Sequence, residues 1–306
     1  MEAPTLSSSF VKEAAIRVGF DACGIAIASP LTEEEWGYEE WLRRGYQADM
    51  AYMEQHRDKR SDPTLLVPGA RSVIVFLSGY KPSQTMQGRV SGARIAQYAY
   101  GEDYHERIKR MLFQLITAIR QQYPDFEAKP CVDTVPISDK QWARRAGLGW
   151  IGRNTLLVNP VLGSYCNIGE LVTPFPADKY DTPIENRCGD CRACVDTCPN
   201  FALTQTADTN VPLLNANRCA SYHTIENRAE TLPEGLHLSG YTFGCDVCQL
   251  VCPYNRTAAV RYQLTDEHKD QLEALKDADP ITFKRLTKHT ALSRIRHSQW
   301  LRNQKK

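Results

Sequence analysis

Four cysteines stand close together in the stretch CGDCRACVDTCPN, residues 188–200. They are separated by two, two and three residues, and a proline follows the last of them. A second run, CDVCQLVCP, begins at residue 245 and also ends in Cys-Pro. Thiolates are the soft ligands that iron–sulfur clusters require, and short spacings let one loop wrap several corners of a cubane. The two runs therefore predict an iron–sulfur protein.

The cysteines of these runs, with Cys219 between them, make two sets of four, the count that two [4Fe–4S] clusters need. In two-cluster ferredoxins the cysteine before the proline crosses over to the other cluster. This rule assigns Cys188, Cys191, Cys194 and Cys252 to one cluster, and Cys198, Cys219, Cys245 and Cys248 to the other. The insertion between Cys219 and Cys245 is long enough to cover a cluster or to contact whatever receives its electrons.

Structural zinc is the alternative for such a pattern. Zinc sites are normally built from paired C-x2-C units or mixed Cys/His sets. The x2-x2-x3 spacing and the two Cys-Pro endings favour iron–sulfur instead. The three remaining cysteines, Cys23, Cys131 and Cys166, are expected to be small buried hydrophobic residues.

A cytoplasmic protein without a membrane segment is the expectation for this chain. Its 306 residues contain no run of 18 apolar residues, and the start MEAPTLSSSFVKEAAIRVGF has no basic segment followed by an apolar one. In the cytoplasm, eleven cysteines favour metal or catalytic roles over disulfides.

Strands mixed with helices predict an α+β fold. SVIVFLSGY (72–80) has the character of a buried strand, and the stretch 103–123 that of a helix. We expect a layered α/β domain over 1–177, a ferredoxin-like two-cluster domain over 178–256, and a short basic helical segment over 257–306. The expected apolar face of the 103–123 helix consists of Ile108, Met111, Leu112, Leu115, Ile116 and Ile119.

Two motifs are rejected. GLGWIG (147–152) satisfies G-x-G-x-x-G, but a helix is expected before it and a strand after it, the reverse of a dinucleotide-binding fingerprint. Its glycines are expected to allow a tight turn or a close backbone approach.

DYHERI (103–108) is close to D-x-H-x-x-G, a pattern in which a histidine binds cobalt, but Ile108 replaces the glycine. His105 is therefore expected at the surface or facing a substrate.

The chain resembles the epoxyqueuosine reductases from near its N-terminus to about residue 255. The blocks that carry the resemblance are RSDP, LLVPGARSVIVFLSGY, YGEDYHERIK, VDTVPISDKQWARRAGLGWIGRNTLLVNPVLGSY and the cysteine runs. The resemblance implies the last step of queuosine biosynthesis, in which the epoxide of a modified guanosine at the tRNA wobble position is reduced to the cyclopentene. It also implies two [4Fe–4S] clusters and base-off cobalamin without a protein histidine on cobalt.

The resemblance further implies site residues. Asp133 matches the proposed proton donor, a role that calls for a carboxylic acid with a raised pKa. Asp139 is the local alternative, although it is expected to be the N-cap of the helix that follows it. For the apolar cobalamin contacts, core packing is the competing explanation. The implied contacts are Arg60, Ala96, Asp133, Leu157, Ile168, Ser221, Asp246 and Val247.

The expected partners are tRNA and an external low-potential electron donor, with the protein itself a monomer. Thr282–Lys306 contains eight Lys or Arg, two His and no acidic residue. This end is either a solvated helical surface or a phosphate-binding surface, and the helical-repeat extension of many family members is not expected here. Neutralising Arg294, Arg296 and Arg302 is accordingly expected to weaken tRNA binding.

Two alternative functions stay open: a reductive dehalogenase that acts on a small organohalide, and a simple electron-transfer ferredoxin.

Overall fold

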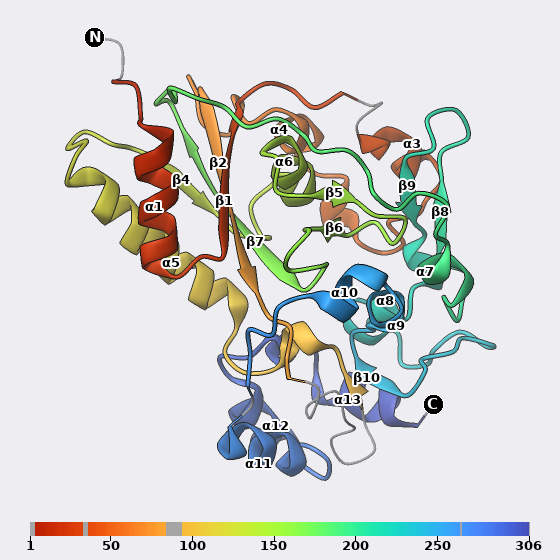
Figure 1. The fold of residues 1–306 in the computed structure, drawn as a ribbon. Coiled ribbons are helices and arrows are strands. Elements are labelled where there is room, and N and C mark those ends of the chain that lie inside the picture. Colours follow the sequence, from red (N-terminus) through yellow and green to blue (C-terminus); the bar gives the residue numbers. More distant parts are fainter. Residues whose placement is uncertain (1–3, 33–35, 84–93, 264, 306) are drawn as a thin grey trace.

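A four-stranded antiparallel sheet lies at the centre of the N-terminal part of the chain (Figure 1). The structure is a computed structural model that describes residues 4–32, 36–83, 94–263 and 265–305. β2 (Ser72–Gly79) and β7 (Cys166–Thr173) are the inner strands of this sheet. β2 is buried along its whole length, which confirms the buried strand expected over residues 72–80. The strand order is β1 (Ala22–Ile27), β2 (Ser72–Gly79), β7 (Cys166–Thr173) and β4 (Lys129–Cys131).

Helices α1 (Ser8–Val18) and α5 (Tyr104–Arg120) cover one face of this sheet, on the left in Figure 1. α5 has an apolar stripe along one side, because its apolar residues recur three and four positions apart. All six apolar residues expected on this stripe are buried, and α5 packs through them against the sheet and α1.

The opposite face of the sheet is covered by α6 (Asp139–Arg145) and by the hairpin of β5 (Trp150–Ile151) and β6 (Leu157–Val158). Trp142 is fully buried there. The rejection of a dinucleotide motif holds in the structure, because α6 precedes GLGWIG and β5 lies within it. Gly149 allows a close backbone approach, since a Cβ there would stand 2.4 Å from the carbonyl oxygen of Val158.

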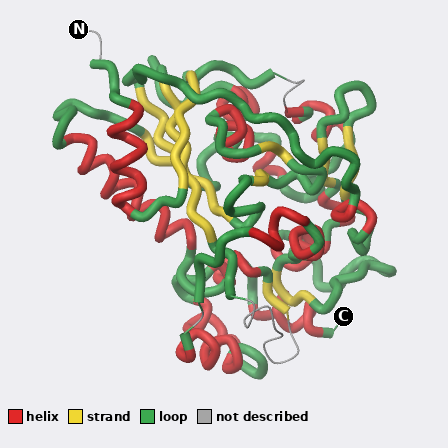
Figure 2. Tube along the Cα trace, in the orientation of Figure 1, coloured by secondary structure: helices red, strands yellow, loops and turns green. Residues whose placement is uncertain are grey.

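The cysteine-rich part of the chain is built mostly of loops (Figure 2). Its strand β10 (Tyr241–Phe243) pairs in parallel with the short β3 (Arg94–Ile95), and this pairing joins the cysteine-rich part to the N-terminal part. Mixed helix and strand content is therefore confirmed. The short elements here are α7 (Ala193–Asp196), β8 (Leu203–Gln205), β9 (Pro212–Leu214), α8 (Ala220–Ile225), β10 (Tyr241–Phe243), α9 (Val247–Leu250) and α10 (Pro253–Thr257).

The C-terminal helices share an apolar cluster with residues from both earlier parts. Ile95, Phe243, Phe283 and Trp300 belong to this cluster. None of the helices in the described residues is long and apolar enough to cross a membrane. The C-terminal helices are α11 (Asp266–Ala274), α12 (Pro280–Thr287) and α13 (His297–Gln304). The remaining helical segments are α3 (Tyr38–Arg43), α4 (Arg57–Ser61) and the 3-10 turns η1 (Ala51–Met53), η3 (Gln97–Ala99), η4 (Ala216–Arg218) and η5 (Ala291–Arg294).

Candidate functional site

One set of four thiols brings the first cysteine run together with the end of the second. Burial raises the pKa of Cys194 to about 11, and its thiol neighbours are Cys188 and Cys252. Burial also raises the pKa of Cys252, whose thiol neighbours are Cys188 and Cys191. Cys191 is the exposed member of this set. The fold thus brings residue 252 next to a run that lies more than fifty positions earlier in the chain.

The other four thiols form the second set. Burial raises the pKa of Cys245 to about 12, and its thiol neighbours are Cys219 and Cys198. Desolvation raises the pKa of the half-buried Cys248 thiol well above its ordinary value, its strongest thiol neighbours are Cys245 and Cys219, and Cys194 of the first set is a weaker one. These neighbours divide the thiols into the same two groups of four that the sequence predicts, and the electrostatic interaction between Cys248 and Cys194 links the two groups. Which cluster each group would hold stays a prediction.

The geometry of these thiols differs from that of a single-ion site. Four thiolates on zinc stand about 2.3 Å from one ion and therefore crowd together. In the residues that the structure describes, no group of three or more His, Cys, Asp or Glu side chains is compact enough to hold one metal ion. A cubane spreads its four ligands over the corners of a body larger than a single zinc ion.

Several N–H groups point at the cysteine sulfurs. The indole Nε1 of Trp150 donates to Sγ of Cys188 over 3.4 Å. The backbone N–H of Ala202 donates to Sγ of Cys198 over 3.3 Å. Such hydrogen bonds stabilise thiolate charge and tune the potential of a bound cluster. Trp150 was not identified from the sequence as a site residue, although it lies in the glycine block whose spacing had suggested a turn.

Asp133 lies where the chain leaves the sheet after β4. Its φ of 48° is in the left-handed region, which Asp tolerates better than most residues. Its Oδ2 lies 3.2 Å from Nε2 of His105. The other ring nitrogen, Nδ1, lies 2.7 Å from Oδ1 of Asp103. Asp103 is the N-cap of α5, so the helix start fixes the ring between two carboxylates.

The charge state of this triad differs from the expectation for a proton donor. Burial works to lower the pKa of His105, but its hydrogen bonds to Asp103 and Asp133 outweigh burial and raise the pKa to about 9. Partial desolvation by the surrounding protein works to raise the pKa of Asp133, but the hydrogen bond from His105 and the charge on its ring outweigh it and lower the pKa. At neutral pH the proton therefore resides on His105, and Asp133 is ionised.

The surroundings of Asp133 are partly exposed. The side chain of Asp133 is 62 % exposed. β4 pairs with β7 at residues 170–172, so among the described residues the first residues of β7 have no strand partner on that side. The three residues Cys166–Ile168 are accordingly only half-buried, although β7 is an inner strand. The result is a partly uncovered stretch of strand close to an exposed carboxylate.

Three further side chains gather around Asp133. Arg294 in η5 pairs with Glu226 through two hydrogen bonds of 2.8 and 2.9 Å. Asp133 and Tyr52 are the other electrostatic neighbours of Arg294. No sequence signal pointed to Tyr52 or Glu226, because they lie far from Asp133 in the chain and match no motif.

Two of the polar cobalamin contacts expected from the sequence are engaged within the protein. Arg60 donates to the carbonyl oxygens of Gln55 and Tyr52, over 3.3 and 3.1 Å. Asp246 is buried, and its carboxylate accepts from the backbone N–H of Gln97 at 2.7 Å and from the Gln249 amide at 2.8 Å. Both side chains already have partners that hold the loops around the site.

The other expected contacts fall into two groups. Leu157 and Ala96 are buried, and Leu157 belongs to the apolar cluster on the α6 face of the sheet. Ile168, Ser221 and Val247 are only half-buried. Ser221 lies on α8 directly after Cys219, and Val247 lies between Cys245 and Cys248 at the start of α9, so both adjoin the second set of thiols.

The expectation that Asp139 is a helix N-cap is wrong. Ser138 is the N-cap of α6, and Asp139 is the first residue within the helix. Its Oδ1 instead accepts the backbone N–H of Asp133 over 3.4 Å. The carboxyl group of Asp139 also meets that of Glu170 on β7.

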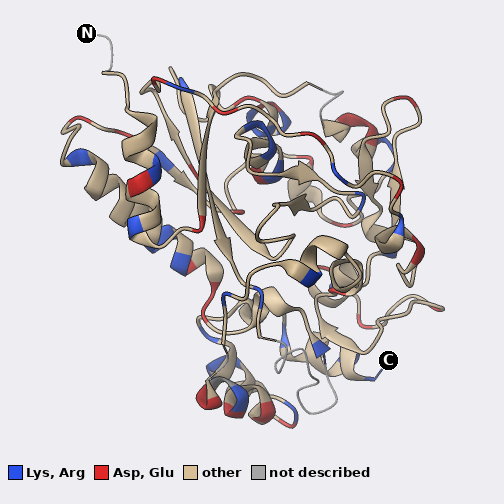
Figure 3. Ribbon diagram, viewed as in Figure 1, with Lys and Arg blue, Asp and Glu red and all other residues tan. Residues whose placement is uncertain are grey.

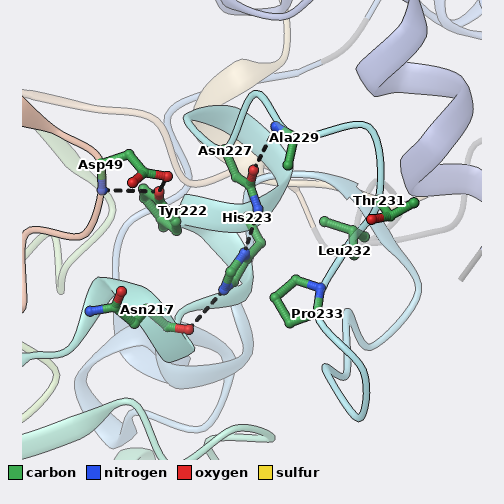
Figure 4. Close-up of a pocket in the computed structure, with 9 residues that line it drawn as sticks. All are labelled: Asp49, Asn217, Tyr222, His223, Asn227, Ala229, Thr231, Leu232 and Pro233. Carbon is green, nitrogen blue, oxygen red and sulfur yellow. Dashed lines mark hydrogen bonds between the residues drawn. The ribbon is translucent and has the colours of Figure 1, made fainter.

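A polar cavity of about 380 Å³ lies beside α8 (Figure 4). His223 on its wall is fixed as the Nε2–H tautomer, because Nε2 donates to the carbonyl of Asn217 at 2.8 Å while Nδ1 accepts from the Asn227 amide at 3.0 Å. Tyr222 donates its hydroxyl to Asp49 over 2.9 Å. The cavity has no residue in common with the surroundings of Asp133, and its hydrogen bonds hold the helix that follows Cys219.

The basic C-terminal residues differ in their environments. Arg302 donates to the carbonyls of His223, Asn227 and Ala229, so it ties α13 to the insertion after Cys219. Asn303 donates to the carbonyls of Thr224 and Thr242 at the two ends of that insertion. In Figure 3 the ribbon of α11 and α12 together carries basic and acidic positions, and α12 itself contains basic residues but no acidic one. The exposed cations of α12 and its C-cap are Lys284, Arg285 and Lys288.

Two family models match the chain. Residues 60–134 match the family described as epoxyqueuosine reductase QueG, DUF1730. Residues 187–255 match the 4Fe-4S double cluster binding domain, which confirms the expectation of two clusters.

Full-length relatives agree with these matches. The epoxyqueuosine reductase of Cyclobacterium marinum is 38 % identical over 97 % of this chain and 95 % of its own length. The solved structure of the Streptococcus thermophilus enzyme is 26 % identical, with a TM-score of 0.84 over 96 % of this chain and 78 % of that chain. An epoxyqueuosine reductase solved with an epoxyqueuosine-modified tRNA-Tyr stem loop is 28 % identical, with a TM-score of 0.83 over the same shares of the two chains.

A more distant likeness concerns the fold alone. A reductive dehalogenase whose structure suggests a mechanism for B12-dependent dehalogenation has a TM-score of 0.50 and is 18 % identical. The likeness covers 94 % of this chain and 37 % of that chain.

Proposed function

The chain belongs to the epoxyqueuosine reductase family, and from this we propose that it reduces epoxyqueuosine to queuosine at the wobble position of tRNA. The observation that carries the proposal is the identity over nearly the full chain to named epoxyqueuosine reductases. The site suits the reaction, because four-cysteine sets for electron transfer lie in the same fold as an exposed carboxylate paired with a protonated histidine. We assign the catalytic domain to residues 1–177, the two-cluster domain to 178–256 and the C-terminal segment to 257–306.

The eight thiols suit two [4Fe–4S] clusters in the crossed arrangement. Cys188, Cys191, Cys194 and Cys252 would hold one cluster, and Cys198, Cys219, Cys245 and Cys248 the other. N–H groups directed at several sulfurs supply the hydrogen bonds that a cluster requires. The exposure of Cys191 makes the first cluster the point where an external low-potential donor delivers electrons.

Cobalamin would bind beside Asp133, next to the partly exposed stretch of β7. Ile168 on the uncovered stretch of β7, and Ser221 and Val247 on the second cysteine loop, are half-buried residues available to a flat macrocycle. Arg60, Ala96, Leu157 and Asp246 would support the loops or strands around it, with Arg60 and Asp246 held by the hydrogen bonds described above. When bound, cobalamin would supply low-potential electrons to the substrate.

The protein residues supply protons. Conversion of an epoxide to an alkene and water consumes two electrons and two protons, and the departing oxygen must be protonated because an alkoxide leaves poorly. Asp133 presents Oδ2 at the exposed side of the site, and His105 Nε2 holds a proton 3.2 Å away. Asp133 therefore transfers the first proton to the departing oxygen, His105 supplies it, and solvent supplies the second proton. Asp103 keeps the histidine ring oriented and charged.

This proton supply predicts a pH profile. The pKa of His105 is raised to about 9, so the ring is charged below this pH and loses its proton above it. We expect kcat/KM to fall as the pH rises through about 9, since kcat/KM reports ionisations of the free enzyme. In His105→Gln the rate is lower and this alkaline decline is absent. An unchanged alkaline decline in His105→Gln would exclude His105 as its source.

The exposed cations of α12 and its C-cap are predicted to contact tRNA. The carbonyl of His289, next to Lys288, accepts the N–H of Asp103, so this surface adjoins the start of α5 and the site. Replacing Lys284, Arg285 and Lys288 together by Gln should weaken tRNA binding and make the slope of log K against log salt shallower by roughly 2 to 3. In Arg302→Gln the melting temperature should fall while the salt slope stays unchanged, because its guanidinium bonds to carbonyls within the protein. An unchanged slope in the triple variant would mean that this surface does not contact tRNA.

The test of the function is turnover by the holoenzyme. Purified protein, reconstituted anaerobically with iron, sulfide and cobalamin, is incubated with epoxyqueuosine-containing tRNA and a chemical reductant. Nucleoside analysis should show queuosine at the expense of epoxyqueuosine. Turnover of an organohalide without queuosine formation would instead support a dehalogenase.

A further inference from the structure

Glu170 is a fully buried carboxylic residue on an inner strand. It has no solvent exposure, and in β7 it lies opposite Cys131 of β4 and Val75 of β2. Within the described part of the chain, neither of its carboxyl oxygens accepts a hydrogen bond from an N–H group or a hydroxyl. An ionised carboxylate in such a place carries a large desolvation cost unless a charge partner or a proton offsets it.

The group that meets Glu170 is another carboxyl. Asp139, at the start of α6, contacts it with its own side chain. Two carboxylates side by side repel each other strongly, and such pairs retain a proton between them. Burial, followed by the nearby charge of Asp133, raises the pKa of Asp139 to about 6. Burial, followed by Asp139, raises the pKa of Glu170 well above its ordinary value.

Among the described residues, no basic side chain is hydrogen-bonded to the two carboxyl groups, although Lys140 interacts electrostatically with Asp139. Lys140 follows Asp139 in α6, but its ammonium donates to the carbonyl of Thr155 over 2.8 Å. Cys131 and Asp133 are the other titratable groups facing the pair, and neither carries positive charge. The charge on His105 reaches the pair only through Asp133, to which its ring is bonded.

The carboxyl pair is connected to the proposed proton donor. Oδ1 of Asp139 accepts the backbone N–H of Asp133 over 3.4 Å. Asp133 has a φ of 48°, a conformation that persists only when surrounding contacts hold it. Asp139 can keep this N–H bonded as long as its own carboxyl stays in place, and the contact with Glu170 fixes that position.

We propose that Glu170 is a neutral acid in the resting enzyme and that it donates its proton in a hydrogen bond to the Asp139 carboxylate, which in turn positions the backbone of Asp133. Glu170 and Asp139 are thus positioning residues for the reaction, and this role rests on the function proposed for Asp133. The pair itself exists in the folded protein whether or not substrate is present.

Infrared spectroscopy tests the neutral acid directly. The difference spectrum between wild type and Glu170→Gln at pH 7 should contain the carbonyl stretch of a protonated carboxylic acid, shifted in D2O. Glu185→Gln, which removes an exposed glutamate, should give no such band. Absence of the band from the Glu170→Gln difference would overturn the proposal, independently of any activity.

Kinetics test the positioning. Glu170→Gln keeps a hydrogen-bond donor for Asp139 and should retain kcat within about threefold. Glu170→Met has a similar volume but no donor, so its kcat should fall about tenfold, which corresponds to the loss of one hydrogen bond. The KM for tRNA should stay unchanged in both variants. Full activity in Glu170→Met, or an equal loss in Glu170→Gln, would overturn the role. If the proposed function itself is wrong, wild type forms no queuosine while the infrared band is still observed.

Discussion

Replacing Asp133 by Asn should reduce kcat for queuosine formation by about 10²- to 10⁴-fold, the range contributed by a positioned general acid. Asn has nearly the same shape, tolerates the φ of 48° and can still bond to His105, so the loop should keep its conformation. What it lacks is a carboxyl able to pass a proton to the departing oxygen. Iron content, cobalamin binding and tRNA affinity should therefore stay at wild-type values while single-turnover rates fall.

Asp125→Asn provides the matched control. Asp125 is exposed and lies beyond the C-terminal end of α5, at the opposite end of this helix from His105. The same chemical change there should leave the rate unchanged. A rate for Asp133→Asn within threefold of wild type would contradict the assignment of Asp133 as the group that protonates the epoxide oxygen.

The crossed arrangement of the cysteines predicts which variants share a phenotype. If Cys198 belongs with Cys219, then Cys198→Ala and Cys219→Ala should both lose the second cluster and retain the same first one. Iron content should fall from about eight to about four per chain, and turnover should cease because the electron path is broken. Electron paramagnetic resonance spectra of the two reduced variants should be superimposable.

The comparison variant is Cys188→Ala, which should retain the other cluster and give a different spectrum. Cys23→Ala, on β1 of the sheet, should keep all its iron and activity. If Cys198→Ala gave the spectrum of Cys188→Ala instead, each run would hold its own cluster, and the crossed arrangement would be refuted.

Local patterns in the sequence were sufficient for the metal chemistry and for the main elements of the sheet domain. The cysteine spacing fixed the type of site, because cluster ligation depends on short stretches of chain. The apolar stripe of α5 and the continuous apolar run of β2 were equally visible, since helix and strand periodicities place their side chains before any tertiary contact forms. The resemblance of whole blocks then pointed to Asp133.

The surroundings of Asp133 could not be derived in this way. The charge on His105 depends on two carboxylates that the fold brings to its ring, and this reversed the expected direction of the Asp133 pKa shift. The N-cap preference that suggested a role for Asp139 is weak compared with the contact to Glu170 from another strand. Sequence therefore determined which ligands and elements the protein has, because these follow from short-range spacing. Only the tertiary structure decided where the protons reside, because burial and the approach of distant charges set the pKa of each group.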